Sequence, residues 1–130
     1  MTLQWTAVCI DCRDGRELAE FYAQLFGWEI TAGDREWFQL GDRAGGVHLN
    51  IQGDPRYQPP TWPEQGDLQQ KMIHLDVRVT PSPGQSPDEA LAAALDVAVV
   101  AGGTPADHQP RDDLRVVLDP AGHPLCLFLD

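Results

Sequence analysis

The chain has 130 residues, 42% of them hydrophobic, which is enough for one domain with a substantial core. Its 20 acidic residues outnumber 9 lysines and arginines, so the formal net charge is −11. This charge argues against nucleic-acid binding, which needs clustered basic side chains, and against binding to an anionic membrane surface. The partners we expect are a small molecule and a second copy of the chain, in a homodimer.

Cys9, Cys12 and Cys126 are an odd number of cysteines without a disulfide framework, which is typical of a reducing cytosol. Cys9 and Cys12 form a C-x-x-C, but they lie in a strand pattern and no second cysteine pair completes a structural zinc site. We therefore expect a cytoplasmic protein in which one cysteine of this pair is a buried thiol and the other is a strand-end residue. No apolar run approaches membrane-spanning length.

The first half of the chain has the pattern of a strand, a helix and further strands. Alternation at Trp5–Ile10 predicts a strand, and helical spacing predicts a helix over Arg16–Phe26, ended by Gly27. The apolar stripe of this helix is Leu18, Phe21, Tyr22, Leu25 and Phe26. Three strands are expected after it, at Trp28–Thr31, Glu36–Leu40 and Gly46–Gln52.

The second half repeats this order after a proline-rich linker of residues 53–71. A strand is expected at Ile73–Val79 and a helix at Pro87–Ala101. The apolar stripe of this helix is Leu91, Ala94, Leu95, Ala98 and Val99. Short strands are expected near Thr104–His108, Leu114–Leu118 and Leu125–Leu129.

A tight turn precedes the last strand. Pro120 presets φ for a turn and Gly122 accepts a positive φ, so the chain is expected to reverse before Pro124. Asp119 is expected to brace this turn, and His123 to cap the hairpin.

These elements predict an α+β fold of two βαβββ modules, about residues 1–52 and 72–130, in a single domain of residues 1–130. Each helix would cover the outside of a curved antiparallel sheet. The other faces of the sheets would form a cleft.

Several motifs resemble those of the glyoxalase/bleomycin resistance/dioxygenase family, which has the vicinal oxygen chelate fold. They are the stretches Asp11–Tyr22, Pro59–Glu64 and His74–Val77, the helix motif FYxxLFGW and the closing DPAGHPLCLFLD. The chain looks most like the compact glyoxalase-like proteins of high-GC bacteria, the actinobacterial type. The resemblance covers nearly the whole chain and implies the paired-module fold. Because the family includes lyases, dioxygenases, epimerases and metal-free drug-binding proteins, it leaves open whether this chain is an enzyme.

Enzymes of this family use a divalent metal to chelate adjacent substrate oxygens. Matching the motifs places the four ligand positions at Ala7, His48, His74 and Cys126. Alanine cannot bind a metal, and cysteine in place of glutamate disfavours Mg²⁺, Mn²⁺ and Fe²⁺. We therefore expect no metal cofactor. The alternative is a lyase or dioxygenase of the glyoxalase/extradiol type, with one divalent ion, most plausibly Zn²⁺, held by His48, His74 and Cys126.

The favoured function is metal-independent binding of a partly apolar organic ligand in the sheet cleft, by side chains that alternate with the apolar ones. The sequence does not identify this ligand. Trp62 would lie near the mouth of the cleft, although it could equally anchor the linker to the sheet. The complete set of expected ligand-binding residues is Trp37, Gln39, His48, Asn50, Trp62, His74, Arg78 and Phe128.

Overall fold

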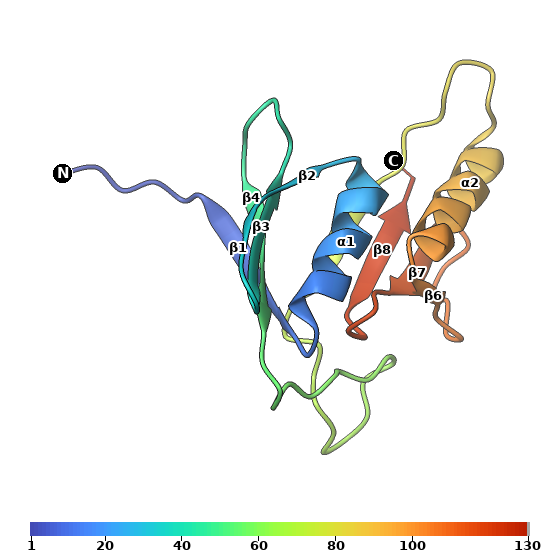
Figure 1. Cartoon of the computed structure of the whole chain (residues 1–130). Helices are drawn as coiled ribbons and strands as arrows, with labels where there is room; N and C mark the ends of the chain where they lie inside the picture. Colours follow the sequence, from blue (N-terminus) through green and yellow to red (C-terminus); the bar gives the residue numbers. More distant parts are fainter. Residues whose placement is uncertain (130) are drawn as a thin grey trace. The chain divides into compact units, whose positions relative to one another are not determined.

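The computed structural model describes residues 1–129, in two compact units, Met1–Gln58 and Pro59–Asp130. Each unit contains a strand, a helix and then further strands (Figure 1). This repeated order confirms the two α+β modules expected from the sequence.

The first unit consists of one sheet and the helix α1 (Gly15–Phe26). The sheet is mixed, because β1 is parallel to β4 whereas the other neighbours are antiparallel. This corrects the antiparallel sheet expected from the sequence: the crossover through α1 returns the chain in its original direction. In the order β1-β4-β3-β2, the strands are β1 (Ala7–Cys12), β4 (His48–Gly53), β3 (Trp37–Gly41) and β2 (Glu29–Gly33).

Helix α1 is defined by its two ends and by one apolar face. The carboxylate of Asp14 accepts a hydrogen bond from the Glu17 amide at 3.1 Å, which caps the first turn. Gly27 ends the helix with a φ of 65°, in the left-handed region that favours glycine. Leu25, expected in the apolar stripe, is only half-buried. The buried residues of the helix are Gly15, Leu18, Ala19, Phe21 and Tyr22.

One face of the first sheet supplies the rest of the core of this unit. Pleating directs alternate residues of each strand to that face. In the expected strand Gly46–Gln52, alternation predicts that Val47 faces the core with Leu49 and Ile51. Val47 instead precedes β4 and is 44% exposed, so that expectation was wrong. The buried residues of this face are Ile10, Cys12, Phe38, Leu40, Leu49 and Ile51.

The second unit repeats this arrangement with the helix α2 (Pro87–Val100). β5 is parallel to β8, and the remaining pairs are antiparallel, so this sheet is also mixed. In the order β5-β8-β7-β6, the strands are β5 (Leu75–Arg78), β8 (Pro124–Phe128), β7 (Leu114–Leu118) and β6 (Thr104–Pro105).

Helix α2 begins with a capping box. The Ser86 side chain accepts from the Glu89 amide, and the Glu89 carboxylate accepts from the Ser86 amide. The buried face follows the 3.6-residue period from Leu91, and Val99 lies to one side of it, 42% exposed. Val99 was therefore wrongly assigned to the apolar stripe, and Leu95 is only half-buried.

Neither helix of residues 1–129 is long and apolar enough to span a bilayer.

The strand expected at Thr104–His108 is only two residues long, although the Ala106 amide still donates to the Val116 carbonyl oxygen at 3.0 Å. The Gln109 side chain adds hydrogen bonds at this point. Gln109 Nε2 donates to the carbonyl oxygens of Ala106 at 2.8 Å and Val116 at 2.9 Å. Its Oε1 accepts from the Val116 amide at 2.8 Å. One side-chain amide thus pairs with both backbone groups of Val116 in β7.

The turn between β7 and β8 is built around a buried carboxylate. Asp119 Oδ1 accepts from the amides of Ala121 and His123, both at 2.9 Å. The His123 ring Nδ1 lies 2.9 Å from Asp119 Oδ2, and the two side chains are 8% and 0% exposed. Gly122 has a φ of 91°. The bracing roles expected for Asp119 and His123 are therefore confirmed.

Candidate functional site

The uncovered face of the first sheet carries four of the side chains predicted for a ligand site. Trp37 and Gln39 in β3, and His48 and Asn50 in β4, alternate with core residues and are half-buried. Gln39 lies directly opposite Asn50 in the antiparallel register. The strand pleat therefore brings these four side chains to one face.

His48 has restricted surroundings on this face. Its Nδ1 lies 3.3 Å from Gln39 Nε2. A Cβ on Gly41 would lie 2.5 Å from the same Nδ1, so glycine is what leaves room for the imidazole. Ala7 is the partner of His48 in the parallel β1–β4 register. Its methyl group offers no ligand atom, so the position beside His48 cannot contribute to a metal site.

Asn50 has a buried oxygen that no group satisfies within residues 1–129. Its Oδ1 is inaccessible to solvent and lacks a hydrogen-bond partner in that part of the chain. An unpaired buried acceptor is costly, so a donor from water or from a ligand would stabilise it. This atom therefore marks a polar point on the first uncovered face.

The two cysteines of the C-x-x-C lie on opposite faces of β1. Cys9 is an exposed residue beside Asn50. The pKa of its thiol is raised, first by partial loss of hydration and then by the charge of Asp11. Cys12 is buried on the core face, where its Sγ lies 3.6 Å from the carbonyl oxygen of Gln52. The pleat thus separates the two thiols.

The uncovered face of the second sheet combines charged, thiol and aromatic side chains. Asp76 in β5 pairs in register with Cys126 in β8, and Arg78 pairs with Phe128. Asp76 and Arg78 are exposed, whereas Cys126 and Phe128 are half-buried. The alternate residues of β8, including Leu125 and Leu127, are buried in the core.

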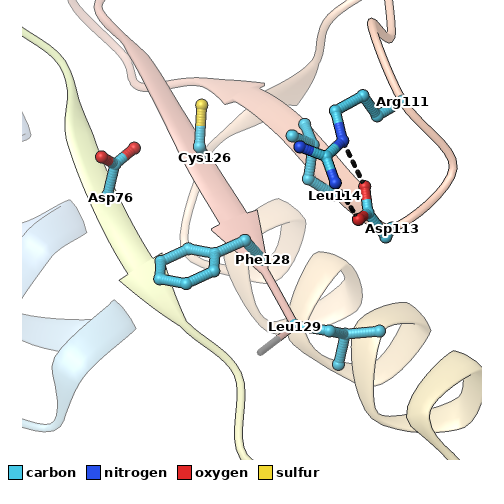
Figure 2. A pocket seen from close by; sticks show the side chains of 7 residues that line it. All are labelled: Asp76, Arg111, Asp113, Leu114, Cys126, Phe128 and Leu129. Atoms are coloured by element: carbon cyan, nitrogen blue, oxygen red, sulfur yellow. Dashed lines mark hydrogen bonds and ion pairs between the residues drawn. The ribbon is translucent and has the colours of Figure 1, made fainter.

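A cavity of about 220 Å³ opens on this face (Figure 2). Figure 2 shows Asp76 on one side of Phe128, and Arg111 and Asp113 on the other. Arg111 Nε donates to Asp113 Oδ1 at 2.8 Å, and its Nη2 forms a second bond to Oδ2. This bidentate pair largely compensates both charges. The cavity is lined by Asp76, Arg111, Asp113, Leu114, Cys126, Phe128 and Leu129.

One corner of this face brings together three potential metal ligands. His74, Asp76 and Cys126 each offer one ligand atom, and these atoms lie within 4.8 Å of one another. His74 Nε2 is 3.4 Å from Asp76 Oδ1. Burial, and then the charge of Asp76, raises the pKa of the Cys126 thiol, which favours its protonated form. The corner can therefore offer an imidazole, a carboxylate and a thiol.

Trp62 makes its contacts within the linker and the segment before β7. Its indole Nε1 donates to the carbonyl oxygen of His108 at 3.0 Å. The Lys71 ammonium lies 5.7 Å from the centroid of the Trp62 ring and forms an ion pair with Glu64 at 2.6 Å. These contacts suit the anchoring role that the sequence left open for Trp62.

The predicted ligand-binding residues are divided between the two units. Phe128 lines the cavity of the second sheet, and His74 contacts the cavity residue Asp76. Arg78 shares the face with Phe128 but is outside the set of residues that line the cavity. The four predicted residues of β3 and β4 belong to the first unit.

Sequence reasoning missed Arg111, Asp113 and Leu114 as cavity residues, and it did not include Asp76 among the expected ligand-binding residues. The pleat was the available signal for Asp76, which alternates with Leu75 and Val77. Arg111 and Asp113 lie just before β7, where no periodic pattern indicates which way a side chain points.

Comparison with known proteins identifies one family. Residues 7–128 match the family described as "Glyoxalase-like domain". No curated protein matches the chain.

Several solved structures share the fold at low sequence identity. A glyoxalase-related enzyme from Fulvimarina pelagi has a TM-score of 0.68 at 18% identity, covering 99% of this chain and 89% of that one. A glyoxalase/bleomycin resistance protein/dioxygenase family enzyme from Burkholderia phytofirmans PsJN has a TM-score of 0.65 at 17% identity, covering 98% of each chain. A glyoxalase/dioxygenase from Nostoc punctiforme has a TM-score of 0.60 at 16% identity, covering 98% of this chain and 90% of that one.

Proposed function

Because this chain belongs to the glyoxalase-like domain family, we propose that it binds a small, partly apolar organic molecule on an uncovered sheet face, without needing a divalent metal. The observation that carries this proposal is the cavity of about 220 Å³ around Phe128. Pockets for drug-sized ligands span roughly 300–1,000 Å³, so the cavity suits a smaller molecule.

The lining of the cavity supports a ligand with both apolar and polar parts. Leu114, Phe128 and Leu129 supply the apolar surface, and the ring of Phe128 offers a flat contact. Asp76 supplies a carboxylate that can accept hydrogen bonds and orient the ligand. A ligand held by these contacts needs no metal.

The binding is tested on protein treated with a chelator. Small aromatic compounds are screened by thermal shift, and the affinity of each hit is measured by calorimetry. Phe128→Ala is expected to weaken binding about tenfold, because the apolar contact of the ring is lost. Val100→Ala is the matched control, since Val100 is 76% exposed on α2 and lies outside the cavity. Equal affinities of the two variants, or binding that vanishes on chelation, would contradict the proposal.

A metal-dependent lyase or dioxygenase is the second candidate, favoured by the cluster of His74, Asp76 and Cys126. When bound, a divalent metal would act as a Lewis acid on adjacent substrate oxygens. The donors here do not suit Mg²⁺ or Mn²⁺, which prefer oxygen ligands, but a thiolate and an imidazole suit Zn²⁺. In this candidate His48 of the first unit would join His74 and Cys126. This candidate would be supported if the parent protein binds one Zn²⁺ per chain and both His48→Ala and Cys126→Ser lose it.

The homodimer and the cytoplasmic location expected from the sequence are proposals as well. Light scattering of the purified chain tests the homodimer, and a molar mass of one chain at micromolar concentration would contradict it.

A further inference from the structure

Three of the residues that line the cavity around Phe128 carry a charge, namely Asp76, Arg111 and Asp113. Arg111 donates two hydrogen bonds to the carboxylate of Asp113, so this pair largely compensates its own charges. Asp76 lies on the other side of Phe128 from the pair (Figure 2). The lining therefore keeps one negative charge, at Asp76, that the Arg111–Asp113 pair does not cancel.

A neighbouring group in the cavity responds to the charge of Asp76. The pKa of the Cys126 thiol is raised first by burial and then by the charge of Asp76. His74 Nε2 lies 3.4 Å from Asp76 Oδ1, but the imidazole forms an ion pair only when it is protonated. Arg78 shares the face with Phe128 and is outside the set of residues that line the cavity. The negative potential that opposes a thiolate at Cys126 would attract a cation to the same space.

The aromatic wall of the cavity also favours a cation. The face of an aromatic ring is negative and attracts a positive group placed within about 6 Å of its centre. Phe128 follows Cys126 by two residues in β8, and Cys126 is the register partner of Asp76. The strand period therefore places the Phe128 ring and the Asp76 carboxylate on one face, where a single flat cation can contact both.

We propose that the organic ligand of this cavity is a small cation, with an amidinium or primary ammonium group on a flat apolar body. This inference rests on the proposed function, because it assigns a charge to the ligand of the same site. The positive group would donate hydrogen bonds to Asp76, and the apolar body would contact Leu114, Phe128 and Leu129. The net charge of the chain, −11, adds a long-range attraction for cations and repels anions.

A series of three compounds of one shape separates charge from fit. Benzamidine, benzamide and benzoate share a planar framework and are respectively positive, neutral and negative at about pH 8. An ordinary histidine is neutral at this pH, which limits competition for Asp76. The affinity of each compound is measured by calorimetry on the full chain, after treatment with a chelator and in buffer of low salt.

We expect benzamidine to bind about tenfold more tightly than benzamide, and benzoate to bind more weakly than both. An exposed ion pair contributes up to about fivefold in affinity, and a cation on an aromatic face contributes about two- to fivefold. The advantage of benzamidine over benzamide should shrink as salt is added, because salt screens exposed charges.

Three variants locate the charge that selects the cation. Asp76→Asn should reduce the preference for benzamidine to about twofold and leave the affinity for benzamide unchanged. Arg111→Gln releases Asp113 from its pair and should strengthen the binding of benzamidine about two- to fivefold. The control Asp96→Asn removes the same charge from an exposed position of α2 outside the cavity, so it should keep the parent's preference. The side chains of Asp76 and Arg111 are 67% and 66% exposed, so these variants should fold, which thermal unfolding checks.

The outcomes distinguish this inference from the proposed function. Equal affinities for benzamidine and benzamide would overturn the charge assignment, whereas benzamide binding that Phe128→Ala weakens would leave the proposed function intact. An unchanged preference in Asp76→Asn, or an equal loss of preference in Asp96→Asn, would also contradict the assignment. Absence of benzamidine binding would overturn it as well, and the wider screen of aromatic compounds would then decide whether the proposed function fails too.

Discussion

Replacement of Asp119 by alanine should destabilise the protein by about 3–5 kcal/mol, because a buried carboxylate that accepts several hydrogen bonds is lost. The carboxylate is 0% exposed and accepts from two amides at 2.9 Å and from the His123 ring at 2.9 Å. Hydrogen bonds to a charged group contribute about 1.5–3 kcal/mol each. Three such bonds are not independent, because two share Oδ1 and water can enter after truncation. The simple sum is therefore an upper limit.

The assay is urea unfolding followed by circular dichroism, with thermal unfolding beside it. A loss of this size corresponds to a fall of roughly 10–20 °C in Tm for a chain of this length. Asp113→Ala is the matched control, because the Asp113–Arg111 pair is 51% and 66% exposed and should contribute no more than about 1 kcal/mol. Asp119→Asn keeps one acceptor oxygen and should fall between the two. If Asp119→Ala is as stable as Asp113→Ala, the turn does not depend on the buried carboxylate.

Three further outcomes follow from burial, charge and backbone geometry. Leu18→Ala should cost about 2–5 kcal/mol in urea unfolding, and Leu25→Ala less, because Leu18 is 1% exposed and Leu25 is half-buried; the reverse order would contradict the packing of α1. The raised pKa of Cys126 means that little thiolate is present at neutral pH, so alkylation of Cys126, measured by peptide mass spectrometry, should be slow and should accelerate as the pH rises. Asp76→Asn should speed this alkylation at a given pH, because it removes a charge that opposes the thiolate. A slower reaction would refute the contribution of Asp76 to the raised pKa. Gly27→Ala should cost about 1–2 kcal/mol through strain alone, since its φ is 65° and no atom lies within 4 Å of the added Cβ; a stabilised variant would exclude this strain.

The helices could be predicted from the sequence nearly to the residue, because their signals are local. Asp14, Gly27 and Ser86 act within one turn of the chain, so their effect does not depend on distant contacts. The strand alternation was similarly informative, and it separated the buried Ile51 from the half-buried Asn50. It failed at Val47, where the pattern continued past the end of the strand.

The candidate site was less predictable, because its shape depends on contacts between segments distant in the chain. Arg111 and Asp113 reach the cavity only through the position of the loop before β7. The strand period predicts that Asp76 shares a face with His74 and Arg78. Its closeness to Cys126, however, follows from the parallel register of β5 and β8. Alternation identifies the face of one strand, whereas register between two strands decides which side chains become neighbours.

Gln109 also affects how this sheet can associate. The edge of a sheet normally presents unpaired amides and carbonyls to which a strand from another molecule can add. In β7 the two-residue β6 pairs with Val117 and Leu118, and the Gln109 amide occupies both backbone groups of Val116. A foreign strand would have to displace this side chain before it could extend the sheet there. The Gln109 side chain, together with the Ala106 amide on the Val116 carbonyl, therefore opposes strand addition at this edge.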